Sequence, residues 1–230
     1  FIQKLEDQPN IETKCMHQAF EGLREHSHNE YFYDKWKKGA TGYPIVDACM
    51  RNLIHEGWIT FRMRALLVSF ASYDLWLDWR ITGKFLAKIF TDYEPGIHYS
   101  QLQMQSGITG INALRIYNPI KQSLEHDPTG TFIRNWLPEL RNVSNVWIHE
   151  PWKMPIEEQI RKNVIINRQY PSPIVDHEQA MKLAKSKISL IRAGDGFKLG
   201  SKRVFEKLGS RKKPLRRTRK ANRSKQLSLF

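Results

Sequence analysis

The chain has 230 residues, of which 40% are hydrophobic and 11% aromatic, so it can bury a packed core. No run of about 18 apolar residues occurs, so we expect no transmembrane helix and no membrane partner. The net charge is +14, and the two cysteines are too few for a four-thiolate iron–sulfur cluster or an all-cysteine zinc site. We therefore expect no metal and a cytoplasmic location. Because the chain begins with Phe1 rather than Met, we expect a piece of a longer product.

Apolar spacing predicts an all-α domain over residues 1–195, with few strands because almost no segment alternates. Residues 1–35 are polar and irregular to helical. Predicted helices lie near 44–56, 59–77, 82–91, 129–141, 156–163 and 176–192. Residues 93–128 contain three glycines and three prolines, which predicts a long loop of the kind that often forms a functional surface.

The helix over residues 44–56 is the best defined of these elements. Pro44 suits the first helical position, where its missing N–H would be unpaired anyway. Gly57 stands where a left-handed cap residue is wanted. Between them, apolar residues fall on one helix face and predict a core helix: Ile45, Val46, Cys49, Met50, Leu53 and Ile54.

The positive charge is concentrated at the end of the chain. Residues 198–230 carry thirteen Lys or Arg and one acid, which leaves about +2 for the rest. The composition of residues 196–225 therefore predicts a disordered basic tail. This tail either only solubilises the protein or binds DNA phosphates non-specifically through counterion release.

Residues 41–53, TGYPIVDACMRNL, resemble the signature of the FAD-binding domain of DNA photolyases and cryptochromes at every defined position. Further blocks follow in the family's order, and the resemblance covers roughly residues 30–185. They include Ser69-Phe70, Asp78-Trp79-Arg80, Asp92, Arg115-Ile116-Tyr117-Asn118-Pro119, Trp136-Leu137-Pro138-Glu139-Leu140 and His149-Glu150-Pro151-Trp152.

The resemblance implies the C-terminal part of a helical FAD-binding domain, incomplete at its N-terminus, in a bacterial photolyase-like protein. It implies light-driven, FAD-dependent repair of UV-induced pyrimidine dimers in DNA by a deoxyribodipyrimidine photolyase-type carbon–carbon lyase. Two alternatives stay open. One is a cryptochrome-like flavin photoreceptor or redox sensor without repair activity, and the other is a DNA- and clamp-binding remnant without flavin.

The resemblance also implies which residues meet the cofactor. Arg64 and Asp92 match a pair that forms a salt bridge beside the isoalloxazine ring, unless they are a surface arginine and a capping aspartate. His98 stands where photolyases usually carry Asn beside flavin N5, and imidazole titrates near physiological pH. His98 is thus a candidate catalytic proton donor, or else an ordinary hydrogen-bonded histidine. The full set of cofactor candidates is Trp58, Arg64, Asp92, Tyr93, Glu94 and His98.

Electron supply and DNA contact depart from the family's pattern. Trp79 matches the middle tryptophan of the photoreduction chain and is the second catalytic candidate, unless it is plain core. The flavin-proximal tryptophan aligns with Leu102, which cannot carry a radical, so either Tyr93 or Tyr99 substitutes or electrons arrive by another route.

The resemblance places Phe61 where the family carries an asparagine that touches the lesion, and Met104 where it carries the lesion-stacking tryptophan. It places four further residues on a loop that meets DNA phosphates in relatives, unless this loop is merely solvated: Arg115, Asn118, Lys121 and Gln122. Together with Arg62, these six residues are the candidates for DNA contact.

The last five residues resemble the pentapeptide with which bacterial repair and replication proteins dock on the sliding clamp. Leu227, Leu229 and Phe230 would fill an apolar pocket while Gln226 supplies directional hydrogen bonds. Residues 226–230 are therefore a candidate clamp-binding peptide.

Overall fold

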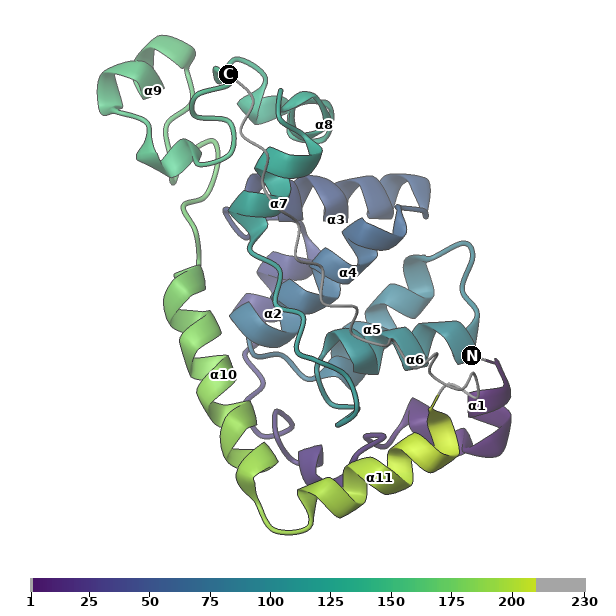
Figure 1. The fold of residues 1–230 in the computed structure, drawn as a ribbon. Helices are drawn as coiled ribbons and strands as arrows, with labels where there is room; N and C mark the ends of the chain where they lie inside the picture. Colours follow the sequence, from purple (N-terminus) through teal and green to yellow (C-terminus); the bar gives the residue numbers. More distant parts are fainter. Residues whose placement is uncertain (1, 210–230) are drawn as a thin grey trace, which may run out of the picture.

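The computed structural model describes residues 2–209, and every regular element in this range is helical (Figure 1). The all-α expectation is thus confirmed. The helices are α1 Ile2–Asp7, α2 Glu30–Lys37, α3 Pro44–Glu56, α4 Phe61–Ser69, α5 Trp79–Ile89, α6 Pro95–Gln105, α7 Pro119–His126, α8 Thr131–Trp136, α9 Ile156–Lys162, α10 His177–Ala193 and α11 Phe197–Leu208.

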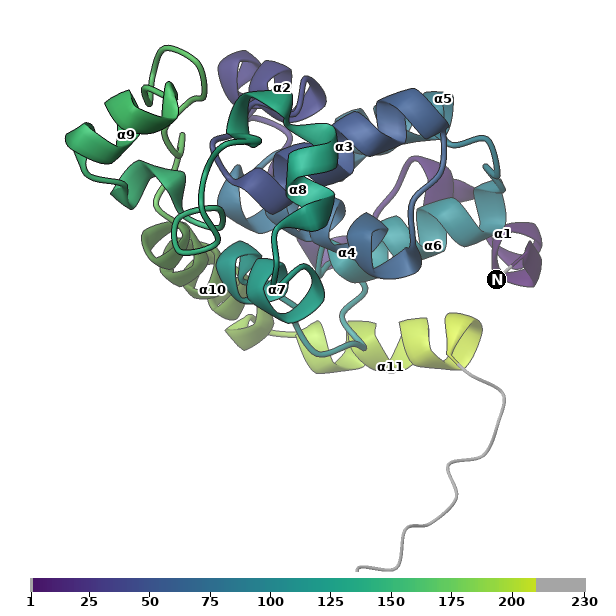
Figure 2. The ribbon, with the colours of Figure 1, turned by 90° about the horizontal axis from the view of Figure 1, so that it is seen from above.

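Two long helices bracket the helical body. In Figure 1, α10 runs down one side and α11 crosses the lower end, so that α11 finishes beside α1. Seen from above in Figure 2, α9 projects at the side opposite α1. No described helix is long and apolar enough to cross a membrane. Across residues 2–209, no three His, Cys, Asp or Glu side chains gather as a metal site.

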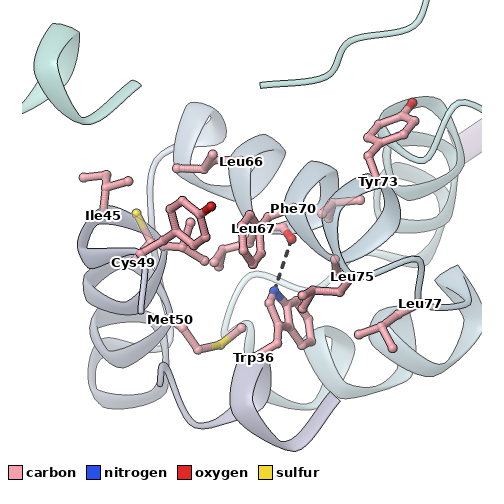
Figure 3. Packing of buried hydrophobic residues seen from close by; sticks show 14 of the residues in the cluster. Trp36, Ile45, Cys49, Met50, Leu66, Leu67, Phe70, Tyr73, Leu75 and Leu77 are labelled. Carbon is pink, nitrogen blue, oxygen red and sulfur yellow. Dashed lines mark hydrogen bonds between the residues drawn. The ribbon is translucent and has the colours of Figure 1, made fainter. Parts of the chain in front are cut away.

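The core forms around α3, whose predicted bounds agree with the structure. Cys49 and Met50 of this helix are fully buried, together with Leu67 of α4. Trp36 of α2 is buried beside them and donates its indole N–H to the Leu67 carbonyl across 3.2 Å (Figure 3). The indole thus adds a large apolar surface without leaving its donor unpaired.

A buried carboxylate fixes the start of α3. Asp47 accepts hydrogen bonds from the Thr41 backbone N–H and hydroxyl at 2.7 Å each and from the Gly42 N–H at 3.0 Å. The Tyr170 hydroxyl donates to it across 2.6 Å. Both carboxylate oxygens are therefore occupied, which ties the signature loop to a segment more than 120 residues later in the chain. Gly42 adopts φ +83°, a conformation that favours glycine.

The long loop predicted over residues 93–128 is wrong, because this range contains α6 and α7. Both helices begin with proline, at Pro95 and Pro119, and both are capped by the preceding side chain. Proline at a first helical position costs no hydrogen bond, so these prolines start helices rather than break them. Residues 106–118 between the two helices are irregular.

The disorder predicted from residue 196 onward is also wrong for its first part, because residues 197–208 form α11. Val204 and Leu208 are buried against Ile11 and Met16 of the N-terminal segment. Total charge was a poor guide here, because the basic side chains of an amphipathic helix can all lie on its outer face. The remainder of the basic tail and residues 226–230 lie outside the described residues.

The predicted helix over residues 59–77 is interrupted. α4 ends at Ser69 and continues as one π-helical turn, Phe70–Asp74. Asp74 in this turn pairs with His177 at the start of α10, with 2.5 Å between Oδ1 and Nδ1, so the turn anchors the bracketing helix. Burial raises the pKa of Asp74 to about 6.

Candidate functional site

A cavity of about 330 Å³ opens between α4, α5 and α6 and the segments joining them. Its walls are largely apolar and include Ala65, Val68, Leu86 and Leu102. Trp58 and Phe61 stand on its rim, and each exposes more than half of its surface. A cavity of this size with apolar walls and a few convergent polar groups is typical of a small-molecule site.

Arg64 and Asp92 form an ion pair at this cavity, with 2.8 Å between Nη2 and Oδ2. Arg64 also donates from Nε to the Ile59 carbonyl at 2.9 Å, and its guanidinium lies 4.3 Å from the Phe90 ring centroid. The ion pair expected from the resemblance is therefore present. The three contacts of Arg64, with Asp92, Ile59 and Phe90, fix the plane of its guanidinium at the cavity wall.

Glu94 and Tyr93 also line the cavity, but their polar groups are engaged elsewhere. The Glu94 carboxylate accepts from the backbone N–H groups of Gly96 and Ile97 and so caps α6. Burial, together with a hydrogen bond that the Tyr93 hydroxyl donates to Tyr99, raises the pKa of Tyr93 to about 12, so this hydroxyl is a neutral group at pH 7.

His98 projects from α6 between α5 and the cavity. Its Nε2 lies 3.0 Å from the Gly83 carbonyl, and because a carbonyl only accepts, Nε2 must carry the proton. Burial lowers the pKa of His98, and the nearby Arg64 charge lowers it further. The imidazole is therefore neutral at pH 7, which leaves Nδ1 as a hydrogen-bond acceptor.

Two glutamines that the sequence analysis did not single out complete the polar lining. Gln105 is buried, yet neither its amide oxygen nor its amide nitrogen has a partner, and the Gln101 oxygen is likewise unpaired. Residues 98, 101 and 105 recur at helical spacing, so they share one face of α6. That spacing is present in the sequence, within the range for which the glycines and prolines predict a loop.

Trp79 is almost fully buried in α5 and does not line the cavity. Its ring centroid lies 6.4 Å from that of Tyr99, and Tyr99 lies 5.1 Å from His98. Leu102 fills the space beside Gly83, where α5 and α6 approach closely. The structure thus places an aromatic series from Trp79 through Tyr99 to the cavity wall.

The candidate DNA-contacting residues are distributed over two cavities and the segments beside them. Phe61 lies on the rim of the cavity described above, whereas Arg62 and Gln122 line a second cavity. Met104 is half-buried and lines neither cavity. Asn118 caps α7 by accepting from the Lys121 N–H, and the side chains of Arg115 and Lys121 are exposed.

The fold and the cavity define a helical ligand-binding domain with an arginine–aspartate pair and open amides facing a largely apolar slot. The family profile described as the FAD binding domain of DNA photolyase matches residues 1–189. The chain therefore belongs to the photolyase/cryptochrome family, as part of its FAD-binding domain, and FAD is the cofactor of this family.

Similar proteins carry both of the family's names. The deoxyribodipyrimidine photo-lyase of Alkalihalophilus pseudofirmus is 41% identical over 173 residues, covering 74% of this chain and 36% of the relative. The cryptochrome DASH of Synechocystis is 36% identical over 157 residues, covering 68% and 32%. The chain thus spans about a third of the length of these relatives.

Two solved structures share the fold. A class III photolyase from Agrobacterium tumefaciens superposes with a TM-score of 0.76 at 30% identity, covering 83% of this chain and 40% of that one. A photolyase from Sulfolobus tokodaii, described with two FAD molecules, gives a TM-score of 0.73 at 31% identity, with coverages of 81% and 41%.

Proposed function

We propose that this protein is a photolyase-type enzyme that uses FAD and light to repair UV-induced pyrimidine dimers in DNA. The observation that carries the proposal is the cavity between α4 and α6, where the Arg64–Asp92 pair meets the unpaired amides of Gln101 and Gln105. Buried amides without partners are costly, so they fit a site that a polar-edged ring completes.

The residues present fit the isoalloxazine of FAD. The apolar walls would hold its ring system, while Arg64, Gln101 and Gln105 would supply donors and acceptors to its polar atoms. When bound and reduced, FAD would absorb light, supply the electron that splits the dimer, and take that electron back afterwards. Leu86, Leu102 and Phe90 exclude water from the buried side of the cavity. Neutral His98 acts in this proposal as an acceptor through Nδ1, and a donor role for it requires a second proton.

The proposal is tested by adding FAD to the protein, recording flavin absorption and following the light-dependent reversal of dimers in DNA. Arg64→Ala removes a charge-assisted hydrogen bond and should weaken FAD binding about tenfold or more. Arg161→Ala, which removes an arginine paired with Glu158 on the remote helix α9, is the matched control and should leave FAD affinity unchanged.

A cryptochrome-type light or redox sensor is the second candidate. It is favoured by Phe61, His98, Leu102 and Met104, which depart from the residues that the family's repair enzymes carry, and by the similarity to cryptochrome DASH. Flavin absorption without dimer reversal would favour this candidate over the repair enzyme. A protein that binds DNA but no flavin would overturn both.

Electrons reach the cavity, within this proposal, through Trp79 and Tyr99, because Leu102 occupies the position of the proximal tryptophan. The contact of 6.4 Å between the ring centroids of Trp79 and Tyr99 supports this route. Tyr99→Phe should slow flavin photoreduction, whereas Tyr117→Phe, a half-buried tyrosine on the irregular segment before α7, should not. Equal photoreduction rates in all three proteins would contradict the route.

The basic tail and residues 226–230 add two partners to the proposal, non-specific DNA and the bacterial sliding clamp. Their support is the sequence alone, nine positive charges in residues 211–225 followed by Gln226-Leu227-Ser228-Leu229-Phe230. The full chain should bind the clamp, and Phe230→Ala should abolish that binding while leaving DNA affinity unchanged. Clamp binding that persists in this variant would refute the assignment.

A further inference from the structure

A second cavity, of about 370 Å³, lies on the other side of α4, enclosed by α3, α4, α7 and α8. α4 is the wall between the two cavities. Phe61, Arg64 and Ala65 line the first, and Arg62 and Leu66 line the second. The floor of the second cavity is apolar and is formed by Ile45, Cys49, Leu66 and Phe132 (Figure 3 shows the first three).

One polar group in this second cavity is open. Gln122 is 8% exposed, and its amide nitrogen donates to the Glu125 carboxylate at 3.3 Å, but its buried amide oxygen has no partner. The neighbouring Asp127, unlike Gln122, has partners for its acceptor atoms. Its carboxylate accepts from the N–H groups of Phe132 and Ile133 and so stabilises the start of α8. The lining of the cavity therefore contains one buried acceptor without a partner, next to an apolar floor.

The mouth of the second cavity carries a guanidinium and an imidazole. Arg62 and His126 line it, both are exposed, and neither forms an ion pair within residues 2–209. Lys121 of the same helix as His126 is exposed, but it pairs with Glu125, with 3.8 Å between Nζ and Oε1. An anionic group at this mouth would meet two side chains that are free to bind it.

We propose that the second cavity is a nucleotide-binding subsite that takes one unstacked base of a DNA strand. The flat base fits the apolar floor, an amino N–H on its edge donates to the Gln122 oxygen, and its phosphate binds Arg62 and His126. A cavity with an apolar floor, one buried acceptor and the N–H donors of a guanidinium and an imidazole at its mouth matches these three parts of a nucleotide. The inference rests on the proposed function, which makes DNA the partner.

The test uses the full chain titrated with dAMP, dCMP and inorganic phosphate, followed by calorimetry or NMR, with affinities on the order of millimolar expected for the nucleotides. Gln122→Leu keeps the volume but removes the acceptor, and should weaken dAMP and dCMP binding about threefold to tenfold. Met63→Trp narrows the cavity from its half-buried wall and should abolish nucleotide binding but spare phosphate binding at the mouth.

The crossed control separates this inference from the proposed function. Gln105→Leu alters the first cavity and should weaken FAD binding without changing nucleotide affinity, whereas Gln122→Leu should do the reverse. Nucleotide affinities that neither Gln122→Leu nor Met63→Trp changes would overturn the inference, as would phosphate binding as tightly as dAMP. Either result, obtained while FAD binding and dimer repair persist, leaves the proposed function standing. Nucleotide binding without FAD binding would instead remove the proposed function alone.

Discussion

Two faces of α6 use the same residue type in opposite ways. Gln103 faces the N-terminal segment, donates from Nε2 to the carbonyls of Ile11 and Lys14 at 2.7 and 2.9 Å, and accepts from the Met16 N–H at 2.7 Å. Gln105, two residues further on, is equally buried and makes no hydrogen bond at either amide atom. The first glutamine closes a contact within the protein, and the second leaves one open toward the cavity.

The comparison teaches how to separate structural from functional polar groups when both are buried. Burying an amide costs free energy, and the cost is recovered only where partners are present. Gln103 recovers it on folding, as Asp47 does at the start of α3. Gln105 recovers it only when something else enters the cavity, so its open amide marks the site more sharply than the apolar lining does.

The largest change in stability is expected on the face of α6 where Gln103 forms its hydrogen bonds. Gln103→Leu would leave the Met16 N–H and the Ile11 and Lys14 carbonyls buried without partners, so the free energy of unfolding should fall by about 2–4 kcal/mol. Urea denaturation followed by circular dichroism measures this loss. FAD affinity, measured under conditions where the variant is folded, should stay unchanged, and a selective loss of FAD binding would contradict the division of α6 into two faces.

Sequence reasoning succeeded where the signal was local. The start and end of α3 follow from Pro44 and Gly57, and no distant contact is needed to specify them. The Arg64–Asp92 pair, by contrast, joins residues 28 positions apart. It was reached only through the family resemblance, because residue types alone do not say which two charges meet.

The open amides of α6 could not have been read from the sequence in the same way. Whether a glutamine is paired depends on the groups that stand opposite, and for Gln103 these come from a segment about 90 residues earlier. The sequence predicts a loop here because Pro95, Gly96 and Gly107 are residue types that favour loops. In the structure Pro95 begins α6 and Gly107 follows its end, positions that these residues favour at helix boundaries.

A smaller effect, of opposite sign, is expected on the open face. Gln105→Leu replaces an unpaired amide by an apolar group of similar size, so the free energy of unfolding of the FAD-free protein should rise by about 1 kcal/mol. The same change should weaken FAD binding. The two measurements, denaturation without FAD and titration with it, should therefore move in opposite directions. A loss of stability comparable to that of Gln103→Leu would show that Gln105 has partners in solution.

The smallest effect concerns the third residue on the open face, His98. Burial lowers its pKa in the folded protein, so between that value and the ordinary value of 6.5 the unfolded chain binds more protons than the folded one. Stability should therefore rise with pH through this window, and His98 should cost stability as pH falls below about 6.5.

His98→Gln tests this sign while keeping the contact to Gly83, because the glutamine Nε2–H reaches about as far from the backbone as the histidine Nε2–H that donates to that carbonyl. The difference in unfolding free energy, wild type minus variant, should shrink steadily as pH is lowered from 7 to 5, since every other titrating group is common to both proteins. Parallel stability profiles would mean that His98 keeps its ordinary pKa. A difference that grows on acidification would mean that the folded protein holds the charged imidazole, which would restore His98 as a proton donor to the cavity.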